Sequence, residues 1–140
     1  MAERETKNDR LLPEEAVRRF ADAVTLRDVD AAIALSDPEI EFLSVLSVDG
    51  RAYKGHDGIR QYFEDVSSAW SEWTVDVERI LAGPDGRVAI VMTMNGRGRE
   101  SAAGFSERTG HVWTLRDGKL LYNEPYRDAE RALTEVGGPQ

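Results

Sequence analysis

The chain has 140 residues, a length typical of one domain, and it contains no cysteine. The absence of cysteine excludes disulfides, thiolate metal sites and cysteine nucleophiles. Acidic residues outnumber basic ones by 26 to 18, which gives a net charge of −8, and the basic residues are scattered. We therefore expect no nucleic-acid partner, because such binding needs a basic patch.

Residues 1–12 are polar and are expected to form a flexible N-terminal arm. They lack the apolar run of a signal peptide, and no stretch of the chain approaches the ~20 apolar residues of a membrane span. We therefore expect a soluble, cytoplasmic protein with no membrane partner. A first helix should start at Pro13, because proline is favoured in a first turn, and continue to about Leu26. Its apolar residues recur at helical spacing: Ala16, Val17, Phe20, Ala23 and Val24.

A short second helix is predicted from Val29 to Leu35, with Asp28 as its N-cap. Ile40 and Phe42 then indicate a strand, with Asp37 and Glu41 read as solvated charges beside it. Asp49-Gly50 is a hairpin turn signal, and residues 51–54 should return as a short strand. A third helix follows the loop at 55–58, where His56 is expected to act as a cap. Its apolar stripe is Ile59, Tyr62, Phe63, Val66 and Trp70.

From Trp73 onward the pattern predicts strands only, up to Arg127. Residues 88–94 are apolar on both faces, as in a central strand that is covered on each side. The last two strands, 106–116 and 119–127, are joined by a turn at Asp117-Gly118. Residues 128–136 indicate a short helix or an irregular end, and 137–140 a C-terminal tail. Helices first and a long run of strands last favour an α+β fold in a single domain at 13–136.

Three blocks of sequence resemble the nuclear transport factor 2-like superfamily, and in particular its SnoaL-like branch, which is related to ketosteroid isomerase. They are Asp37 to Phe42, Tyr53 to Phe63, and His111 to Leu120 leading to Tyr126-Arg-Asp128. The resemblance implies a curved, mostly antiparallel mixed sheet of about six strands. Three helices would pack on its concave side and enclose a cone-shaped pocket. The superfamily includes isomerases, cyclases, hydratases and non-catalytic modules, so fold alone does not decide among these functions.

The chemistry of ketosteroid isomerase uses a carboxylate base, a tyrosine and a protonated aspartic acid. The resemblance places these three groups at Phe42, Phe20 and His111, respectively. Phenylalanine has neither a hydroxyl nor a proton acceptor, so steroid-type isomerisation is disfavoured. His111 is left as the candidate catalytic residue, because it shares a strand face with Trp113 and apolar neighbours. The alternative is a partly buried histidine with one satisfied hydrogen bond.

The remaining pocket residues follow from strand and helix faces. Asn123 would orient a ligand carbonyl if its face of the last strand is inward; otherwise Glu124 and Tyr126 are the polar groups. Core packing is the alternative role for the methionines. The predicted pocket lining is Phe20, Phe42, Tyr62, Trp70, Met92, Met94, Trp113 and Asn123.

Three functions stay open at this point. The chain is a cofactor-free acid/base enzyme (an isomerase, cyclase, hydratase or hydrolase), a non-catalytic ligand-binding module, or a structural dimerisation domain. The expected ligand is a small apolar or semi-polar organic molecule, with no metal and no nucleotide cofactor. A homodimer is expected through the outer face of the long strands, where Ala89, Val91, Thr93, Val112 and Thr114 would expose an apolar area. Helices covering that face are the competing explanation.

Overall fold

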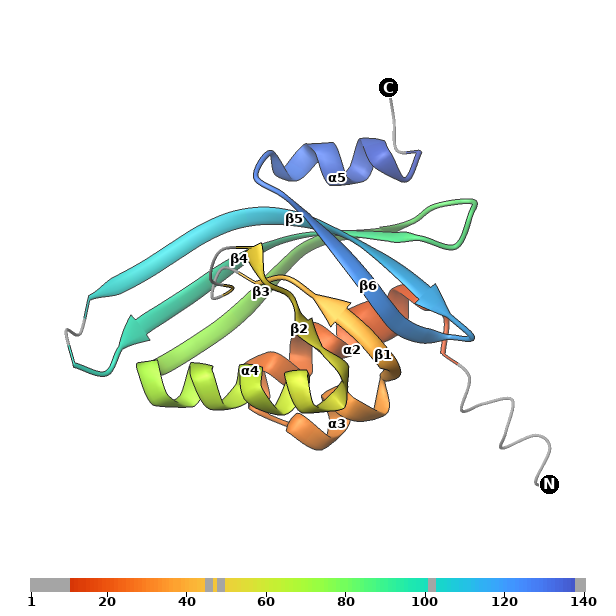
Figure 1. Cartoon of the computed structure of the whole chain (residues 1–140). Coiled ribbons are helices and arrows are strands. Elements are labelled where there is room, and N and C mark those ends of the chain that lie inside the picture. Colours follow the sequence, from red (N-terminus) through yellow and green to blue (C-terminus); the bar gives the residue numbers. More distant parts are fainter. Residues whose placement is uncertain (1–10, 45–46, 48–49, 101–102, 138–140) are drawn as a thin grey trace.

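The sheet and its helices are seen in a computed structural model that describes residues 11–44, 47, 50–100 and 103–137 (Figure 1). The described helices are α2 (Pro13–Leu26), α3 (Val29–Ala34), α4 (Gly55–Ala69) and α5 (Ala129–Glu135). The strands are β1 (Ser36–Phe42), β2 (Tyr53–Lys54), β3 (Trp70–Ala82), β4 (Val88–Gly98), β5 (Gly104–Arg116) and β6 (Lys119–Tyr126). The sheet curves over α2, α3 and α4, and α5 lies on its opposite side (Figure 1).

The strands form one open, six-stranded mixed sheet in the order β2-β1-β6-β5-β4-β3. Strands β3 to β6 run antiparallel in sequence, and β1 pairs with β2 in the same way. Among the described strands, the one parallel pair joins β1 to β6, so that the first strand lies against the last. The predicted α+β fold, with a curved mixed sheet around its helices, is confirmed.

The main hydrophobic core lies between the concave face of the sheet and helices α2 and α4. Helix α2 turns Val17, Phe20 and Val24 inward, and all three side chains are buried. The Phe20 ring meets Trp113 of β5 edge-on, with 5.4 Å between ring centroids. Burying each such large apolar side chain stabilises the fold by about 1.5–3 kcal/mol. The core therefore fixes α2 against the centre of the sheet.

Helix α5 covers part of the convex face, which the sequence analysis assigned to a dimer contact. It forms a second buried cluster with the sheet, made of Ala89, Val91, Val112, Ala129, Ala132, Leu133 and Val136. The expectation that the first three of these are exposed is therefore wrong, because the C-terminal helix packs on them. Thr93 and Thr114 remain half-buried. The homodimer itself stays a prediction.

Several local predictions need correction. Trp70 begins β3 and does not continue the helical stripe, since α4 ends at Ala69. Lys54 is the N-cap residue of α4, without a side-chain cap bond, and His56 lies inside the helix with Nε2 3.0 Å from the Ser36 carbonyl oxygen. Asp37 is buried and not solvated, because Arg116 binds its carboxylate at 2.8 and 3.1 Å.

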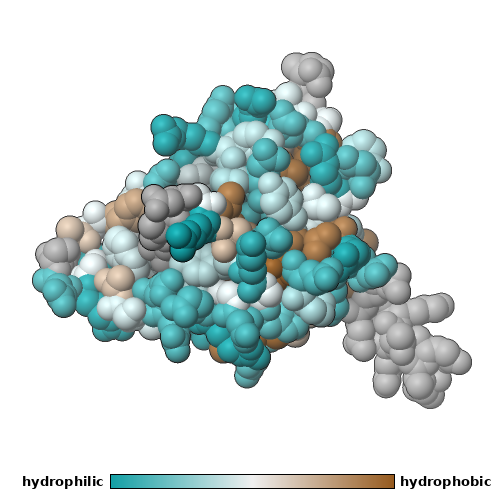
Figure 2. All heavy atoms as spheres, viewed as in Figure 1, coloured by the Kyte–Doolittle hydropathy of each residue, from teal (hydrophilic) through white to brown (hydrophobic). Residues whose placement is uncertain are grey.

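The surface seen in Figure 2 is mostly hydrophilic, with a group of hydrophobic residues over β6. No described helix is long and apolar enough to cross a membrane. The predicted division into an arm at 1–12, a domain at 13–136 and a tail at 137–140 stays a prediction. Residues 1–10 and 138–140 lie outside the described residues, as does Asp49 of the predicted hairpin turn.

Candidate ligand-binding site

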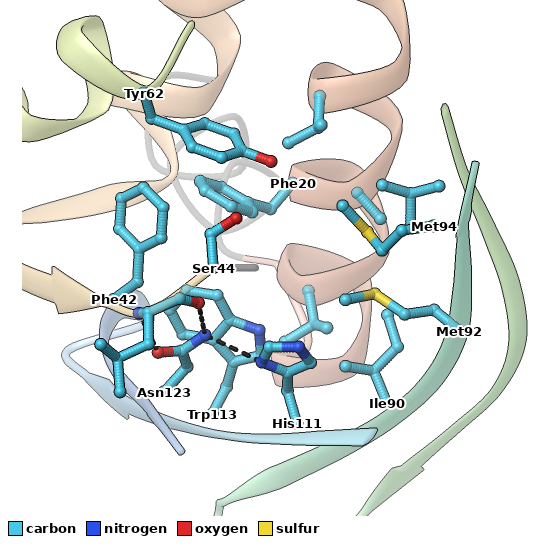
Figure 3. A pocket seen from close by; sticks show the side chains of 15 residues that line it. Phe20, Phe42, Ser44, Tyr62, Ile90, Met92, Met94, His111, Trp113 and Asn123 are labelled. Carbon is cyan, nitrogen blue, oxygen red and sulfur yellow. Dashed lines mark hydrogen bonds between the residues drawn. The ribbon is translucent and has the colours of Figure 1, made fainter. Parts of the chain in front are cut away.

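A small cavity lies between α2 and the concave face of the sheet (Figure 3). Its volume is about 60 Å³, and most of its wall is apolar. The lining residues come from α2, α4, β3, β4, β5, β6 and the end of β1 with the two residues that follow it: Val17, Phe20, Ala21, Val24, Phe42, Leu43, Ser44, Tyr62, Val75, Ile90, Met92, Met94, His111, Trp113 and Asn123. The cavity is thus a partly open gap in the main core, lined by parts of the chain that are distant in sequence.

All but one of the residues predicted to line a pocket lie in this wall. They are Phe20, Phe42, Tyr62, Met92, Met94, His111, Trp113 and Asn123. Trp70 is the exception. Its ring packs on Trp73 and Phe105, at centroid distances of 5.0 and 5.7 Å, away from the cavity. The reason is that Trp70 is extended at the start of β3, so its side chain leaves the helical stripe.

Strand alternation brings the polar groups together at the floor of the cavity. His111 and Trp113 are two residues apart on β5, so both side chains point to the concave face. On the neighbouring strand, Asn123 lies directly opposite Trp113. Ile90 of β4 lies opposite His111 on the other side. The face of β6 that carries Asn123 is therefore inward, and Glu124 is exposed on the outer face.

Asn123 ties three segments of the chain together. Its Oδ1 accepts a hydrogen bond from the Leu43 backbone N–H at 2.7 Å, and its Nδ2 donates to the Leu43 carbonyl oxygen at 3.0 Å. The same Nδ2 lies 3.0 Å from Nδ1 of His111 (Figure 3). Asn123 is only 2% exposed. The amide therefore bridges the segment after β1 and the imidazole on β5 by hydrogen bonds.

The His111 side chain is uncharged in this setting. Burial among apolar groups lowers its pKa to about 4, because the protein replaces the water that would solvate an imidazolium. No carboxylate is among the residues that line the cavity, so nothing in the wall offsets this effect. At neutral pH the ring is therefore a neutral hydrogen-bonding group.

A second polar group lies on the helical side of the cavity. The Tyr62 hydroxyl accepts a hydrogen bond from Nε1 of Trp73 at 3.1 Å and is also hydrogen-bonded by Ser44. Burial raises the pKa of Tyr62, so the phenol stays protonated. Among the residues described, no group of three or more His, Cys, Asp or Glu side chains lies close enough together to hold a metal ion.

Leu43 and Ser44 were missed by reasoning from the sequence. They follow the end of β1 and take part through backbone and hydroxyl groups, which leave no periodic pattern. Val17, Ala21 and Val24 were also missed, although their signal was present. They lie three or four positions from one another or from Phe20, on the same helical face.

Comparison with known proteins agrees with the observed fold. The family model described as the SnoaL-like domain matches residues 17–123, while no curated protein matches the chain. A Mycobacterium tuberculosis protein in complex with estradiol-17β-hemisuccinate has a similar structure, with a TM-score of 0.72 and 17% identity, over 83% of this chain and 94% of that one.

Two further solved structures are similar over most of their length. One is a hypothetical protein from Catenulispora acidiphila with a ketosteroid isomerase-like fold, in complex with trimethylamine; the TM-score is 0.71 at 17% identity, over 89% of this chain and 94% of that one. The other is TerC, co-crystallised with polyporic acid; the TM-score is 0.70 at 21% identity, over 90% and 98%. At these identities the likeness concerns the fold.

Proposed function

Since the chain belongs to the SnoaL-like domain family, with a nuclear transport factor 2-like fold, we propose that its cavity binds a small, neutral, semi-apolar organic molecule. One observation carries the proposal. Nε2 of His111 makes no hydrogen bond with any residue that the structure describes, although His111 is only 7% exposed and most of the wall around it is apolar. Apolar pockets with a few convergent polar groups are the usual form of small-molecule sites.

The size of the cavity limits the ligand. Sites for drug-sized molecules measure about 300–1,000 Å³, whereas this cavity measures about 60 Å³. Met92 and Met94 form part of the wall, and methionine side chains adapt readily because they are unbranched and flexible. We therefore expect a ligand of about one ring, or a larger one that displaces the methionines. Two similar structures hold ring-bearing organic molecules, which supports a ring compound.

Catalysis by acid/base chemistry is the second candidate, and His111 is the group that favours it. A general base works best when its pKa lies near the working pH, and the pKa of about 4 for His111 makes it a weak base at neutral pH. No lining carboxylate takes over that role. The polar groups of the cavity therefore favour reversible ligand binding over proton transfer as its function.

Methionine-methyl spectroscopy tests the proposal directly. The chain has three methionines, and two of them line the cavity. Titration of protein labelled with ¹³C in the methionine methyl groups with cyclohexanone should shift the resonances of Met92 and Met94. His111→Leu should weaken the binding, whereas His56→Gln, which alters the histidine outside the cavity, should not. Methyl resonances that stay unchanged up to millimolar cyclohexanone, and with a panel of larger ring ketones, would exclude the proposed binding site.

A further inference from the structure

We propose that Asn123 is a positioning residue that fixes the tautomer of His111, so that an Nε2–H donor faces the cavity and selects ligands with a hydrogen-bond acceptor. The inference rests on the proposed binding function and gives it a ligand class. Neutral molecules with a ketone, ester or amide carbonyl oxygen fit this class. Hydrocarbons and protonated amines do not, because neither offers an acceptor to the imidazole.

The orientation of the Asn123 amide is the first step. Leu43 presents a backbone N–H, which can only donate, and a backbone carbonyl, which can only accept. The N–H is 2.7 Å from one side-chain atom of Asn123, and the carbonyl oxygen is 3.0 Å from the other. Only one orientation of the amide satisfies both bonds, with Oδ1 toward the N–H and Nδ2 toward the carbonyl. The backbone of Leu43 thus removes the usual ambiguity between the two ends of an asparagine amide.

The tautomer of His111 follows from that orientation. The atom of Asn123 that lies 3.0 Å from Nδ1 of His111 is Nδ2, a donor. Nδ1 must then be the acceptor and carry no proton. A neutral imidazole has its proton on the other nitrogen, which is Nε2. Burial lowers the pKa of the ring, which agrees with a neutral imidazole. An imidazolium would also set an Nδ1–H against the N–H of the amide.

The direction of Nε2 decides what the donor can bind. Figure 3 shows the second ring nitrogen of His111 on the side away from Asn123, among the side chains that line the cavity. It makes no hydrogen bond with any residue that the structure describes. Both N–H groups of Asn123 are already engaged, one by Leu43 and one by His111. Asn123 therefore acts on a ligand through His111 and does not contact a carbonyl itself.

A single substitution should reverse this arrangement. The carboxylate of Asn123→Asp can only accept, so His111 would have to place a proton on Nδ1. Nε2 would then be an acceptor, or the ring would become a cation paired with the new carboxylate. A neighbouring negative charge raises the pKa of a histidine by about 1–3 units. The donor facing the cavity would be lost in the neutral Nδ1–H form, whereas the cation would keep an Nε2–H.

Nitrogen NMR of the unliganded protein tests the tautomer. The chain has two histidines, so ¹⁵N-histidine labelling gives two ring systems, and His56→Gln identifies that of His111. We expect the neutral Nε2–H form in the wild type at pH 7, unchanged down to pH 5. Asn123→Asp should give the Nδ1–H or cationic form and raise the pKa of His111 by about 2 units. A wild-type spectrum with Nδ1–H or a cation at pH 7 would overturn the inference, whether or not the variant folds.

Binding of two matched probes then tests the selectivity. Cyclohexanone and methylcyclohexane have similar shapes, but only the ketone has an acceptor. At pH 8, where the ring should be neutral in both proteins, we expect wild-type protein to bind the ketone about tenfold more tightly and Asn123→Asp to lose that preference. Equal affinity of the wild type for both probes would contradict the role of the donor. Failure of both probes to bind, together with an Nε2–H spectrum, would instead refute the proposed binding function and leave the tautomer in place.

Discussion

Asn123 Nδ2 lies 3.0 Å from His111 Nδ1 at the floor of the cavity, and both side chains are buried. The contact joins β6 to β5, while the same amide holds the backbone of Leu43 beyond the end of β1. A histidine held this way has one nitrogen occupied by the protein and the other directed into an apolar space. Its charge state therefore affects the stability of the fold as well as the chemistry of the site.

The pKa of His111 predicts that the fold weakens in mild acid. The folded-state pKa is about 4, below the ordinary value of 6.5, so between these values the unfolded chain binds a proton and the folded chain does not. The contribution to stability is complete above pH 6.5 and is lost as the pH falls toward 4. We expect the free energy of unfolding, measured by urea denaturation, to fall by about 2 kcal/mol between pH 7 and pH 4.5.

The control for this experiment is His111→Gln, which has no titratable ring. Its free energy of unfolding should fall much less between pH 7 and pH 4.5, whereas that of His56→Gln should fall as in the wild type. Carboxylates such as Asp37 and Glu130 have pKa values below their ordinary values of 3.8 and 4.5, so they lose most of their contribution to stability below about pH 4.5. Identical losses in the wild type and in His111→Gln would show that His111 is not the cause.

Met94 should limit the size of the ligand. Its side chain is 5% exposed and forms part of the cavity wall. Met94→Ala should lower the free energy of unfolding by about 2–5 kcal/mol, because it leaves a larger void in the core. The same void should strengthen the binding of bulky ring ketones, measured by calorimetry. Val112→Ala is the matched control, since it removes core volume under α5 and should not alter binding. A Met94→Ala protein that remains folded but binds these ketones no better than the wild type would contradict this limit.

The overall fold could be predicted because its signals are local and repeated. Helical spacing placed Phe20 inside, and strand alternation placed His111 and Trp113 on one face. The contacts of the site could not be predicted in the same way. Leu43 meets Asn123 only because β1 packs parallel to β6, and the two residues are 80 positions apart. The residues next to Leu43 in the sequence carry no signal that predicts this hydrogen bond.

Two further predictions from the sequence were wrong, one about the solvation of Asp37 and one about the convex face of the sheet. Asp37 looks solvated in the sequence because its partner Arg116 is 79 positions away. The cover over the convex face comes from α5, which has seven residues. A segment that short is indistinguishable from an irregular end until the sheet beneath it is known, since its stability comes from packing on that sheet.

The ion pair between Asp37 and Arg116 should contribute more to stability than the pair between Glu39 and the same arginine. The Asp37 side chain is 10% exposed and receives two bonds from the guanidinium and one from the Glu39 backbone N–H. Asp37→Asn should therefore lower the free energy of unfolding by about 1–3 kcal/mol. Glu39 also pairs with Arg116, but its side chain is 74% exposed, so Glu39→Gln should change stability by less than about 0.5 kcal/mol. Similar losses in the two variants would contradict this difference, which urea denaturation at pH 7 measures.

Gly110 of β5 should be essential for the packing of α5. A Cβ at this position would lie 2.5 Å from the Ala129 carbonyl oxygen and 2.8 Å from the Ala132 Cβ, so only glycine allows the helix to approach this closely. Gly110→Ala should lower the free energy of unfolding by about 1–3 kcal/mol, as overpacking does. Gly104→Ala is the matched control on the same strand, because its added Cβ would meet nothing within 4 Å.

The same two variants test the predicted homodimer. Helix α5 covers the apolar side chains of Ala89, Val91 and Val112. Displacing this helix with the Gly110→Ala substitution should expose them and promote self-association. Light scattering should then report a higher mass for Gly110→Ala than for the wild type at equal concentration, and no change for Gly104→Ala. A wild type that is already dimeric, with the same mass in both variants, would place the dimer contact on a surface that α5 does not cover. A monomeric Gly110→Ala would exclude this face as a contact between copies, because exposing it would have had no effect.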